Sequence, residues 1–213
     1  MSAVAIDRAA FIRANTKLAA PPLVPEIRLH LAEQSVPIWE KTEAELQEIG
    51  LPPPYWAFAW AGGQALARYL LDTPGIVRGR RVVDLAAGSG LCAIAALKAA
   101  AAAALAADID IFAEPAIRLN AAANGVCVST TTADLLDGPV PDADTVLVGD
   151  LFYEKTLALR AYGFLAACRA GGLDVLIGDP GRSYCPRDKL VPIACYAVPV
   201  TRELEDALVK ETM

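Results

Sequence analysis

The stretch VVDLAAGSGLCAIAALKAA, Val82–Ala100, holds an apolar run, an acid, two glycines one residue apart and an alanine-rich segment. The apolar run suits a buried strand, because aliphatic and β-branched side chains are typical of that environment. Gly88 and Gly90 allow a sharp turn with a ligand close to the backbone, and Ile94–Ala104 has a good helix former at nearly every position. This order predicts a strand, a tight loop and a helix, the first unit of a doubly wound α/β nucleotide-binding sheet.

The charge beside this loop indicates which nucleotide it binds. Gly88–Ala93 fits the Gly-x-Gly-x-x-Gly/Ala pattern of dinucleotide sites, but there the loop faces a dianionic pyrophosphate that the carboxylate of Asp84 would repel. S-adenosylmethionine has no phosphate, and its methionine half carries a sulfonium and an ammonium that an acid attracts. We therefore favour S-adenosylmethionine over NAD. A glycine turn without any ligand stays open, because Gly-x-Gly alone is a weak signal.

The length of 213 residues predicts a single domain with a sizeable core. We expect residues 1–50 to form a helical extension packed on that core, with helices at Ala3–Asn15, Ile27–Leu31 and Val36–Ile49. Residues 51–213 are expected to form the cofactor-binding domain.

The composition limits the classes of partner and the cell compartment that we expect for this protein. The formal net charge of −6 argues against a large nucleic-acid surface, since phosphate binding needs a basic face. Leu91–Ala107 is nearly uncharged, but Lys98 interrupts it, so we predict a buried helix and a strand rather than a membrane span. The five cysteines are odd in number and form no Cys-x-x-Cys pair, which predicts buried thiols rather than disulfides or a metal site. With no export signal at the N-terminus, we expect a cytoplasmic protein without nucleic-acid or membrane partners.

An aromatic cluster precedes the glycine loop. Leu51–Asp72 places three prolines ahead of four aromatic residues within six positions, followed by the glycine pair Gly62 and Gly63. We expect this pair to release the chain into a helix at Gln64–Leu71. Trp60 suits either the core or the wall of a ligand pocket, because both locations bury its ring. The sequence leaves these two roles open.

Acids follow the next two predicted strands. Ala104–Ile109 ends near Asp108 and Asp110, about twenty residues beyond the glycine loop, where a carboxylate accepts the ribose hydroxyls of an adenosine. We favour Asp108 for the ribose, because Asp110 is also placed to cap the following helix. Val126–Thr132 leads to Asp134, which suits either the adenine amino group or a turn.

The fourth predicted strand, Asp144–Val148, delivers an acid and aromatic residues to the same edge of the sheet. Asp150 is placed to bind an incoming cationic amine, and Phe152 and Tyr153 to flank it through cation–π contact. The alternative is that Asp150 caps the next helix and the two rings pack in the core.

The rest of the chain completes the predicted sheet. A helix at Tyr153–Arg169 leads to a strand at Leu173–Ile177, and GDPGRSY, Gly178–Tyr184, forms a turn at the same rim. Leu190–Val200 offers one more strand, and the C-terminal residues a short final one.

Motifs at these strand ends resemble the seven-β-strand protein methyltransferases, whose signature after strand four is Asp-x-x-Tyr. The residues that carry the resemblance are Asp84-x-x-x-Gly88-x-Gly90, Asp108-Ile-Asp110 and Asp150-Leu-Phe-Tyr153. Four longer segments are similar to the lysine methyltransferases of electron transfer flavoprotein β-subunit, in their bacterial form: FIRANT (Phe11–Thr16), PPLVPEIRLHLA (Pro21–Ala32), PPPYWAFAWAGGQALARYLLD (Pro52–Asp72) and GDPGR (Gly178–Arg182).

The resemblance implies a seven-stranded, mostly parallel Rossmann-like sheet with helices on both faces, and an enzyme that methylates lysines of the flavoprotein β-subunit. It implies that S-adenosylmethionine is held by Asp84, Gly88, Gly90 and Asp108, with Trp60, Asp110 and Asp134 along it, while Asp150, Phe152 and Tyr153 line the lysine entrance. A ribosomal-protein lysine methyltransferase is the alternative within this class. An NAD-dependent oxidoreductase and a non-catalytic cofactor-binding protein are the alternatives from other classes.

Methyl transfer sets a requirement on the lysine. In-line displacement at the sulfonium carbon needs a neutral amine, whereas a free lysine, with a pKa of about 10.4, is almost wholly protonated at neutral pH. A water-poor site beside a positive sulfonium lowers the pKa of the amine, so no strong base is required. We therefore expect Asp150 to orient the amine and hold its charge on entry, and the proton to leave to solvent.

Overall fold

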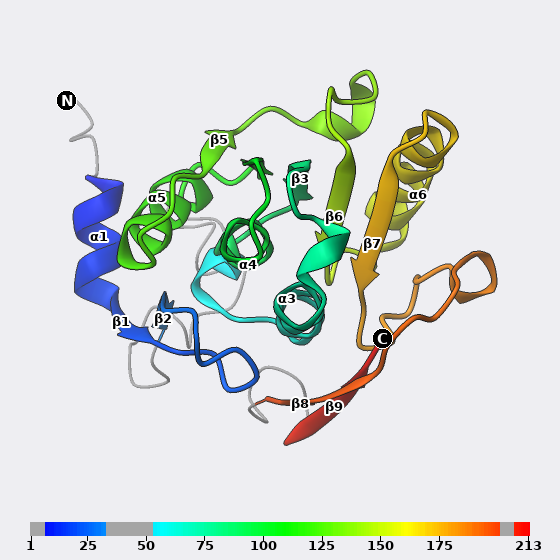
Figure 1. The fold of residues 1–213 in the computed structure, drawn as a ribbon. Coiled ribbons are helices and arrows are strands. Elements are labelled where there is room, and N and C mark those ends of the chain that lie inside the picture. Colours follow the sequence, from blue (N-terminus) through cyan, green and yellow to red (C-terminus); the bar gives the residue numbers. More distant parts are fainter. Residues whose placement is uncertain (1–6, 33–52, 201–206) are drawn as a thin grey trace.

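A five-stranded parallel sheet forms the centre of the protein (Figure 1). The structure is a computed structural model that describes residues 7–32, 53–200 and 207–213. The strands lie in the order β5-β4-β3-β6-β7, with β3 pairing with β4 on one side and β6 on the other. Their bounds are Arg81–Leu85 for β3, Ala103–Ala107 for β4, Ser129–Thr131 for β5, Thr145–Gly149 for β6 and Asp174–Gly178 for β7. Successive strands are added on one side of β3 up to β5 and then on its other side from β6 onward. Open α/β sheets bind ligands at this switch point between β3 and β6.

Helices cover both faces of this sheet, as predicted. On one face, side chains such as Val82 and Leu147 pack with α3, α4 and α5 in one hydrophobic cluster. On the other face, Val83 and Val146 pack with α6. The helices are α3 (Ala61–Asp72), α4 (Leu91–Lys98), α5 (Ala113–Ala123) and α6 (Lys155–Ala170). Short 3-10 helices occur at η1 (Tyr55–Ala57), η2 (Pro74–Ile76), η3 (Leu135–Asp137) and η4 (Arg187–Lys189).

The predicted helix at Ile94–Ala104 is too long. α4 ends at Lys98, and Ala100 adopts a left-handed conformation with φ of 69° before Ala103–Ala107 enters the sheet as β4. Alanine favours helix in isolation, but the hydrogen bonds that β4 makes to β3 and β5 outweigh that local preference.

The N-terminal segment contains a hairpin as well as a helix. α1 (Arg8–Asn15) leads into β1 (Thr16–Ala19), which pairs antiparallel with β2 (Leu29–Ala32). The predicted helix at Ile27–Leu31 is therefore wrong, because five residues form too few helical hydrogen bonds to compete with a strand partner. The predicted helix at Val36–Ile49 lies outside the described residues. Figure 1 shows α1 beside α5, against which it packs.

The C-terminal strands form a second small sheet. β8 (Tyr196–Pro199) pairs antiparallel with β9 (Val209–Thr212), apart from the five central strands. The prediction of seven strands in one sheet is thus not confirmed. The backbones of Met213 and Asp179 exchange two hydrogen bonds of 2.8 and 3.1 Å, which attach the end of this hairpin to the chain leaving β7.

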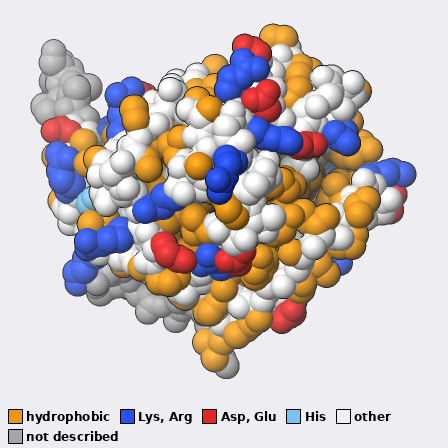
Figure 2. Space-filling view, in the orientation of Figure 1, with side chains coloured by type: hydrophobic (Ala, Val, Ile, Leu, Met, Phe, Trp, Pro, Cys, Tyr) orange, Lys and Arg blue, Asp and Glu red, His pale blue; other side chains and the backbone are white. Residues whose placement is uncertain are grey.

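The surface corrects one prediction about the cysteines. Cys92 and Cys168 are buried, but Cys127 and Cys195 are exposed, so burial of all the thiols is wrong. On the face drawn in Figure 2, Lys and Arg side chains stand among Asp and Glu side chains. Within the described ranges, no helix is both long enough and apolar enough to cross a membrane.

Candidate functional site

A cavity of about 570 Å³ opens at the carboxyl ends of the central strands. Its wall combines the ends of β3, β4 and β6 with the glycine loop, η1 and the start of α3. Most residues that the sequence singled out meet there, namely Trp60, Asp84, Gly88, Asp108, Asp110, Asp134, Asp150 and Tyr153. Two others, Gly90 and Phe152, are not part of the wall.

The glycine loop has the backbone conformation that its sequence suggests. Gly88 and Gly90 have φ values of 51° and 77°, in the left-handed region that side chains disfavour. Gly90 lies immediately before α4, and a Cβ there would come within 3.0 Å of Ile117. Gly90 therefore serves the packing of α4 against α5, and Gly88 borders the cavity.

Asp84 is a buried acid at the end of β3. Its side chain is 2% exposed, and its Oδ2 accepts a 2.8 Å hydrogen bond from the backbone amide of Ala93. Burial, with a smaller contribution from the charge of Asp108, raises the pKa of Asp84 to about 8. A cationic group beside it would stabilise the ionised form, so the cavity wall presents an acid that is suited to a cation.

Asp108 and Asp110 have different contacts at the end of β4. Asp108 accepts hydrogen bonds from the amides of Gly88 (2.8 Å) and Asp110 (2.9 Å), which fixes its carboxylate against the glycine loop. Asp110 accepts from the amide of Phe112 at 2.8 Å, just before α5. Burial raises the pKa of both acids, that of Asp110 to about 6. Phe112 is the N-cap of α5, and no side chain caps this helix, so the predicted capping role of Asp110 is not observed. The choice of Asp108 for the ribose stays a prediction.

Asp134 takes part in a turn at the rim of the cavity. Its Oδ1 accepts from the amide of Leu136 at the start of η3, and its Oδ2 forms a 2.7 Å ion pair with Arg160. The hydrogen bond from Arg160 is the main reason that the pKa of Asp134 is lowered. The turn role is therefore present, and the contact with adenine stays a prediction.

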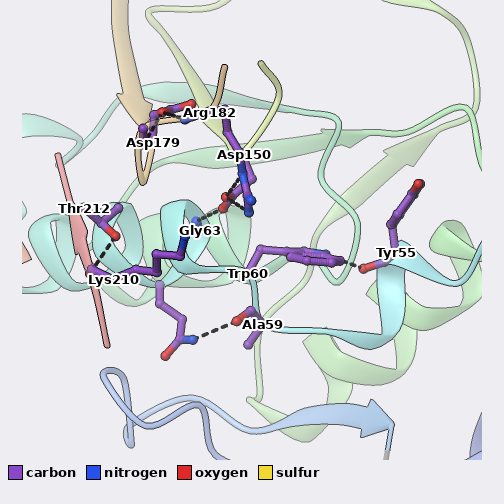
Figure 3. A network of polar contacts seen from close by, with 11 residues as sticks. Tyr55, Ala59, Trp60, Gly63, Asp150, Asp179, Arg182, Lys210 and Thr212 are labelled. Carbon is purple, nitrogen blue, oxygen red and sulfur yellow. Dashed lines mark hydrogen bonds and ion pairs between the residues drawn. The ribbon is translucent and has the colours of Figure 1, made fainter. Parts of the chain in front are cut away.

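Asp150, at the end of β6, is held by two other segments of the chain. Its side chain is 8% exposed and its φ is 57°. Oδ2 accepts from the amide of Gly63 at 3.1 Å, and Oδ1 accepts from Nε and Nη2 of Arg182 at 3.1 and 2.6 Å. Figure 3 shows the carboxylate between these two donors. The sequence pattern predicts a turn at this rim for GDPGRSY but does not indicate this role of Arg182.

The glycine pair allows α3 to reach Asp150. Both glycines lie inside α3, so the expectation that they precede the helix is wrong. A Cβ on Gly62 would overlap the carbonyl oxygen of Gly178, and a Cβ on Gly149 would come within 3.0 Å of Gly63. Without side chains at these positions, the N-terminus of α3 approaches the ends of β6 and β7. Its positive dipole thereby stabilises the charge of Asp150.

Aromatic rings border the Asp150 end of the cavity. The indole Nε1 of Trp60 donates to the carbonyl oxygen of Tyr55 at 3.0 Å, and the guanidinium carbon of Arg182 lies 5.8 Å from the centre of the Trp60 ring. Tyr153 is half exposed, with its ring 5.9 Å from that of Tyr55. Of the two roles left open for Trp60, the structure gives it the pocket wall.

Phe152 does not flank the site. It is fully buried in the hydrophobic cluster between the sheet and α6, together with Leu151 and Phe164. The sequence suggested a place beside the amine because Phe152 neighbours Tyr153. However, the chain directs one ring into the core and leaves the other at the cavity.

Comparison with known proteins relates the chain to methyltransferases. Residues 65–151 match the family model of ribosomal protein L11 methyltransferase (PrmA). A relative from Xenopus laevis, electron transfer flavoprotein beta subunit lysine methyltransferase, is 42% identical over 194 residues, covering 88% of this chain and 78% of that protein. The protein of that name from Rattus norvegicus is 39% identical over 197 residues, covering 89% and 76%.

A solved structure is similar to about half of the chain. The ribosomal protein L11 methylase from Lactobacillus delbrueckii subsp. bulgaricus is 28% identical, with a TM-score of 0.44, over 52% of this chain and 55% of that one. The two relatives described above are animal proteins, so a bacterial form stays a prediction.

Proposed function

This chain belongs to the family of electron transfer flavoprotein beta subunit lysine methyltransferases, and we propose that it methylates lysines of such a β subunit. The enzyme is a protein-lysine methyltransferase, and S-adenosylmethionine is its methyl donor. The observation that carries the proposal is a single cavity whose wall holds both a buried acid suited to a cation, Asp84, and the rim formed by Asp150 and Arg182.

The cavity has the size and donor set for the cofactor. A volume of about 570 Å³ lies within the range of sites that bury small ligands. Asp84 and Asp108 both line this cavity, and we propose that Asp84 binds the ammonium of the methionine half and Asp108 the ribose hydroxyls. We propose that Gly88 and Gly90 shape the loop against the cofactor, with Trp60, Asp110 and Asp134 along its length.

We propose that the part of the cavity beside Asp150 receives the lysine. When bound, S-adenosylmethionine supplies a methyl carbon that the neutral lysine Nζ attacks, while the electrons of the broken C–S bond stay on sulfur. Asp150, Tyr153 and Trp60 line this part of the wall, and we propose that Asp150 orients the amine while the two rings enclose its alkyl chain. Such positioning is worth orders of magnitude in rate, because a displacement of about 1 Å can cost about a hundredfold.

Labelled S-adenosylmethionine and a purified flavoprotein β subunit test the proposal directly. The wild-type protein is expected to label the subunit on lysine, and Asp150→Asn to lose about tenfold or more of the rate. Asp142→Asn is the matched control, because Asp142 is 90% exposed and pairs with Arg81 away from the cavity. If the subunit is not labelled although the cofactor binds normally by calorimetry, the proposed substrate is wrong.

A ribosomal protein is the second candidate substrate. The family match to ribosomal protein L11 methyltransferase favours it, but that match ends at residue 151, before the segment that carries Arg182. Purified ribosomal proteins in the same labelling assay separate the two: label on them alone would retain the chemistry and replace the flavoprotein target.

A further inference from the structure

We propose that Arg182 cancels the charge of Asp150 at the lysine end of the cavity, so that the entering lysine can lose its proton before methyl transfer. This role rests on the proposed function and deepens it. Arg182 is a positioning residue, since it acts through the carboxylate, which it contacts through Nε and Nη2 at 3.1 and 2.6 Å. The ion pair is largely shielded from water, with side-chain exposures of 20% for Arg182 and 8% for Asp150.

An unpaired carboxylate would oppose the reaction. A negative charge close to a lysine ammonium stabilises the protonated amine and raises its pKa, typically by 1–3 units at a separation of about 4–6 Å. Methyl transfer needs the neutral amine, so a lone Asp150 would hold the lysine in its unreactive form. A guanidinium on Oδ1 removes most of this effect, while the carboxylate remains available as a hydrogen-bond acceptor.

The chain fixes Arg182 in this position by contacts of its own. The amides of Gly181 and Arg182 donate to Oδ1 of Asp179 at 2.7 and 2.8 Å, which closes a turn after β7. The backbone of Asp179 is in turn bound to that of Met213. The guanidinium also lies over the ring of Trp60 (Figure 3). The arginine is therefore preorganised at the cavity wall.

The other titratable and charged groups around this end do not replace Arg182. Among those that line the cavity from neighbouring elements are Tyr55 of η1, Asp84 of β3, Cys92 of α4, Tyr153 after β6 and Arg160 of α6. At the turn after β7, Cys185 lies beside Asp179, and the guanidinium of Arg187 lies against Gly181. Burial and the charges of Asp84 and Asp150 raise the pKa of the Cys92 thiol, which keeps it neutral. Arg160 is engaged by Asp134 and Asp137. Arg182 is thus the cation that contacts Asp150 in the described chain.

The pH dependence of the single-turnover methylation rate tests this role through a charge cycle. Arg182→Gln removes the positive charge of the pair, so the midpoint of its pH profile is expected to rise by about one unit or more, with about tenfold slower methylation at pH 7 and a lower KM. Asp150→Asn removes the negative charge, and its midpoint is expected to fall. The double variant removes both charges, so its midpoint is expected to return close to that of the wild type, although at a lower rate.

Two further variants separate this role from a structural one. Arg182→Lys keeps the charge and is expected to keep the wild-type midpoint, and Arg169→Gln, an exposed arginine on α6, is the matched control. Cofactor affinity by calorimetry and thermal unfolding establish that each variant is folded. If Arg182→Gln does not fold on its own, the rise of the midpoint from Asp150→Asn to the double variant still measures the charge of Arg182.

The outcomes distinguish this proposal from the function on which it rests. A rate that falls equally at every pH in Arg182→Gln, or a double variant that keeps the displaced midpoint, would overturn the charge balance and leave the methyltransferase assignment intact. A wild-type protein that labels neither the flavoprotein subunit nor a ribosomal protein would instead remove the proposed substrates, and with them the basis for this role.

Discussion

At the scale of single residues, Asp84 shows the conflict between binding and stability most directly. Its carboxylate is buried at the end of β3, and a single backbone amide, that of Ala93, donates to it at 2.8 Å. A buried acid with few donors is costly to ionise, which is why its pKa rises to about 8. The same cost makes the site receptive to a cation, because a positive ligand supplies the missing counter-charge.

Asp84→Asn is expected to stabilise the cofactor-free protein at high pH and to weaken cofactor binding. Because the pKa of Asp84 is about 8 when folded and near 3.8 when unfolded, the native state holds the extra proton between these values, and wild-type stability falls as pH rises through this window. The variant does not lose stability in this window. Its free energy of unfolding should therefore exceed that of the wild type by nothing near pH 4 and by a few kcal/mol at pH 8. Thermal unfolding at both pH values, with Asp142→Asn as control, measures it.

A gain that is equal at pH 4 and pH 8 would contradict the titration of Asp84. Calorimetry on the same variants adds a second readout. Cofactor affinity of the wild type should increase as pH rises toward 8, since the bound cation favours the ionised acid, and this pH dependence should be lost in Asp84→Asn.

At the scale of elements, the start of α3 is placed by glycine. Gly62→Ala would drive a Cβ into the carbonyl oxygen of Gly178, so α3 has to move away from β7 and from Asp150. We expect a loss of about 3 kcal/mol in stability, at the upper end of the usual cost of overpacking, together with slower methylation. Denaturant unfolding and the labelling assay measure the two effects.

The control for this substitution lies in another helix. Gly163 of α6 is exposed, and a Cβ there meets nothing within 4 Å, so Gly163→Ala is expected to stabilise the protein by about 0.5–1 kcal/mol through helix propensity. If Gly62→Ala and Gly163→Ala change the stability alike, the role of Gly62 in letting α3 approach β7 is contradicted.

Local sequence patterns predicted the elements of the central sheet. The wrong predictions lie where contacts with residues distant in sequence determine the structure. Apolar runs bounded by glycine or acids predicted most of the parallel strands, since buried strands read as short hydrophobic segments, whereas β5 is the polar segment Ser129–Thr131. Ala103 has the same local preference as the alanines of α4, yet it pairs with Arg81 of β3. Leu29 likewise became part of a strand because Ala19 lies opposite it.

At the scale of the whole molecule, Asn120 joins three parts of the chain. It is fully buried in α5, accepts from the amide of His30 of β2 at 2.7 Å, and donates to the carbonyl oxygen of Ser89 in the glycine loop at 2.9 Å. The N-terminal hairpin, α5 and the cofactor loop are therefore connected through one side chain.

Asn120→Ala is expected to lower stability by about 2 kcal/mol or more, because it leaves buried polar groups of His30 and Ser89 without their partner. It should also weaken cofactor binding, since the glycine loop loses a restraint. Asn124→Ala is the control: Asn124 makes the analogous hydrogen bonds to Arg28 near the surface, where water can replace them. Thermal unfolding and calorimetry measure both variants, and equal losses would contradict the role of the buried amide.

The sequence by itself determined the strand–loop–helix unit at Val82–Ala100 and the acids that follow each strand, because these depend on residues adjacent in the chain. Since parallel strands carry their carboxyl ends to one edge, it also determined that Asp84, Asp108 and Asp150 meet at one cavity. Only the tertiary structure decided the charge at the lysine end. Arg182 lies 32 residues from Asp150 in sequence, and their contact exists because β6 and β7 are neighbours and glycines let α3 close over both. Charge compensation depends on distance in space, which no local pattern encodes.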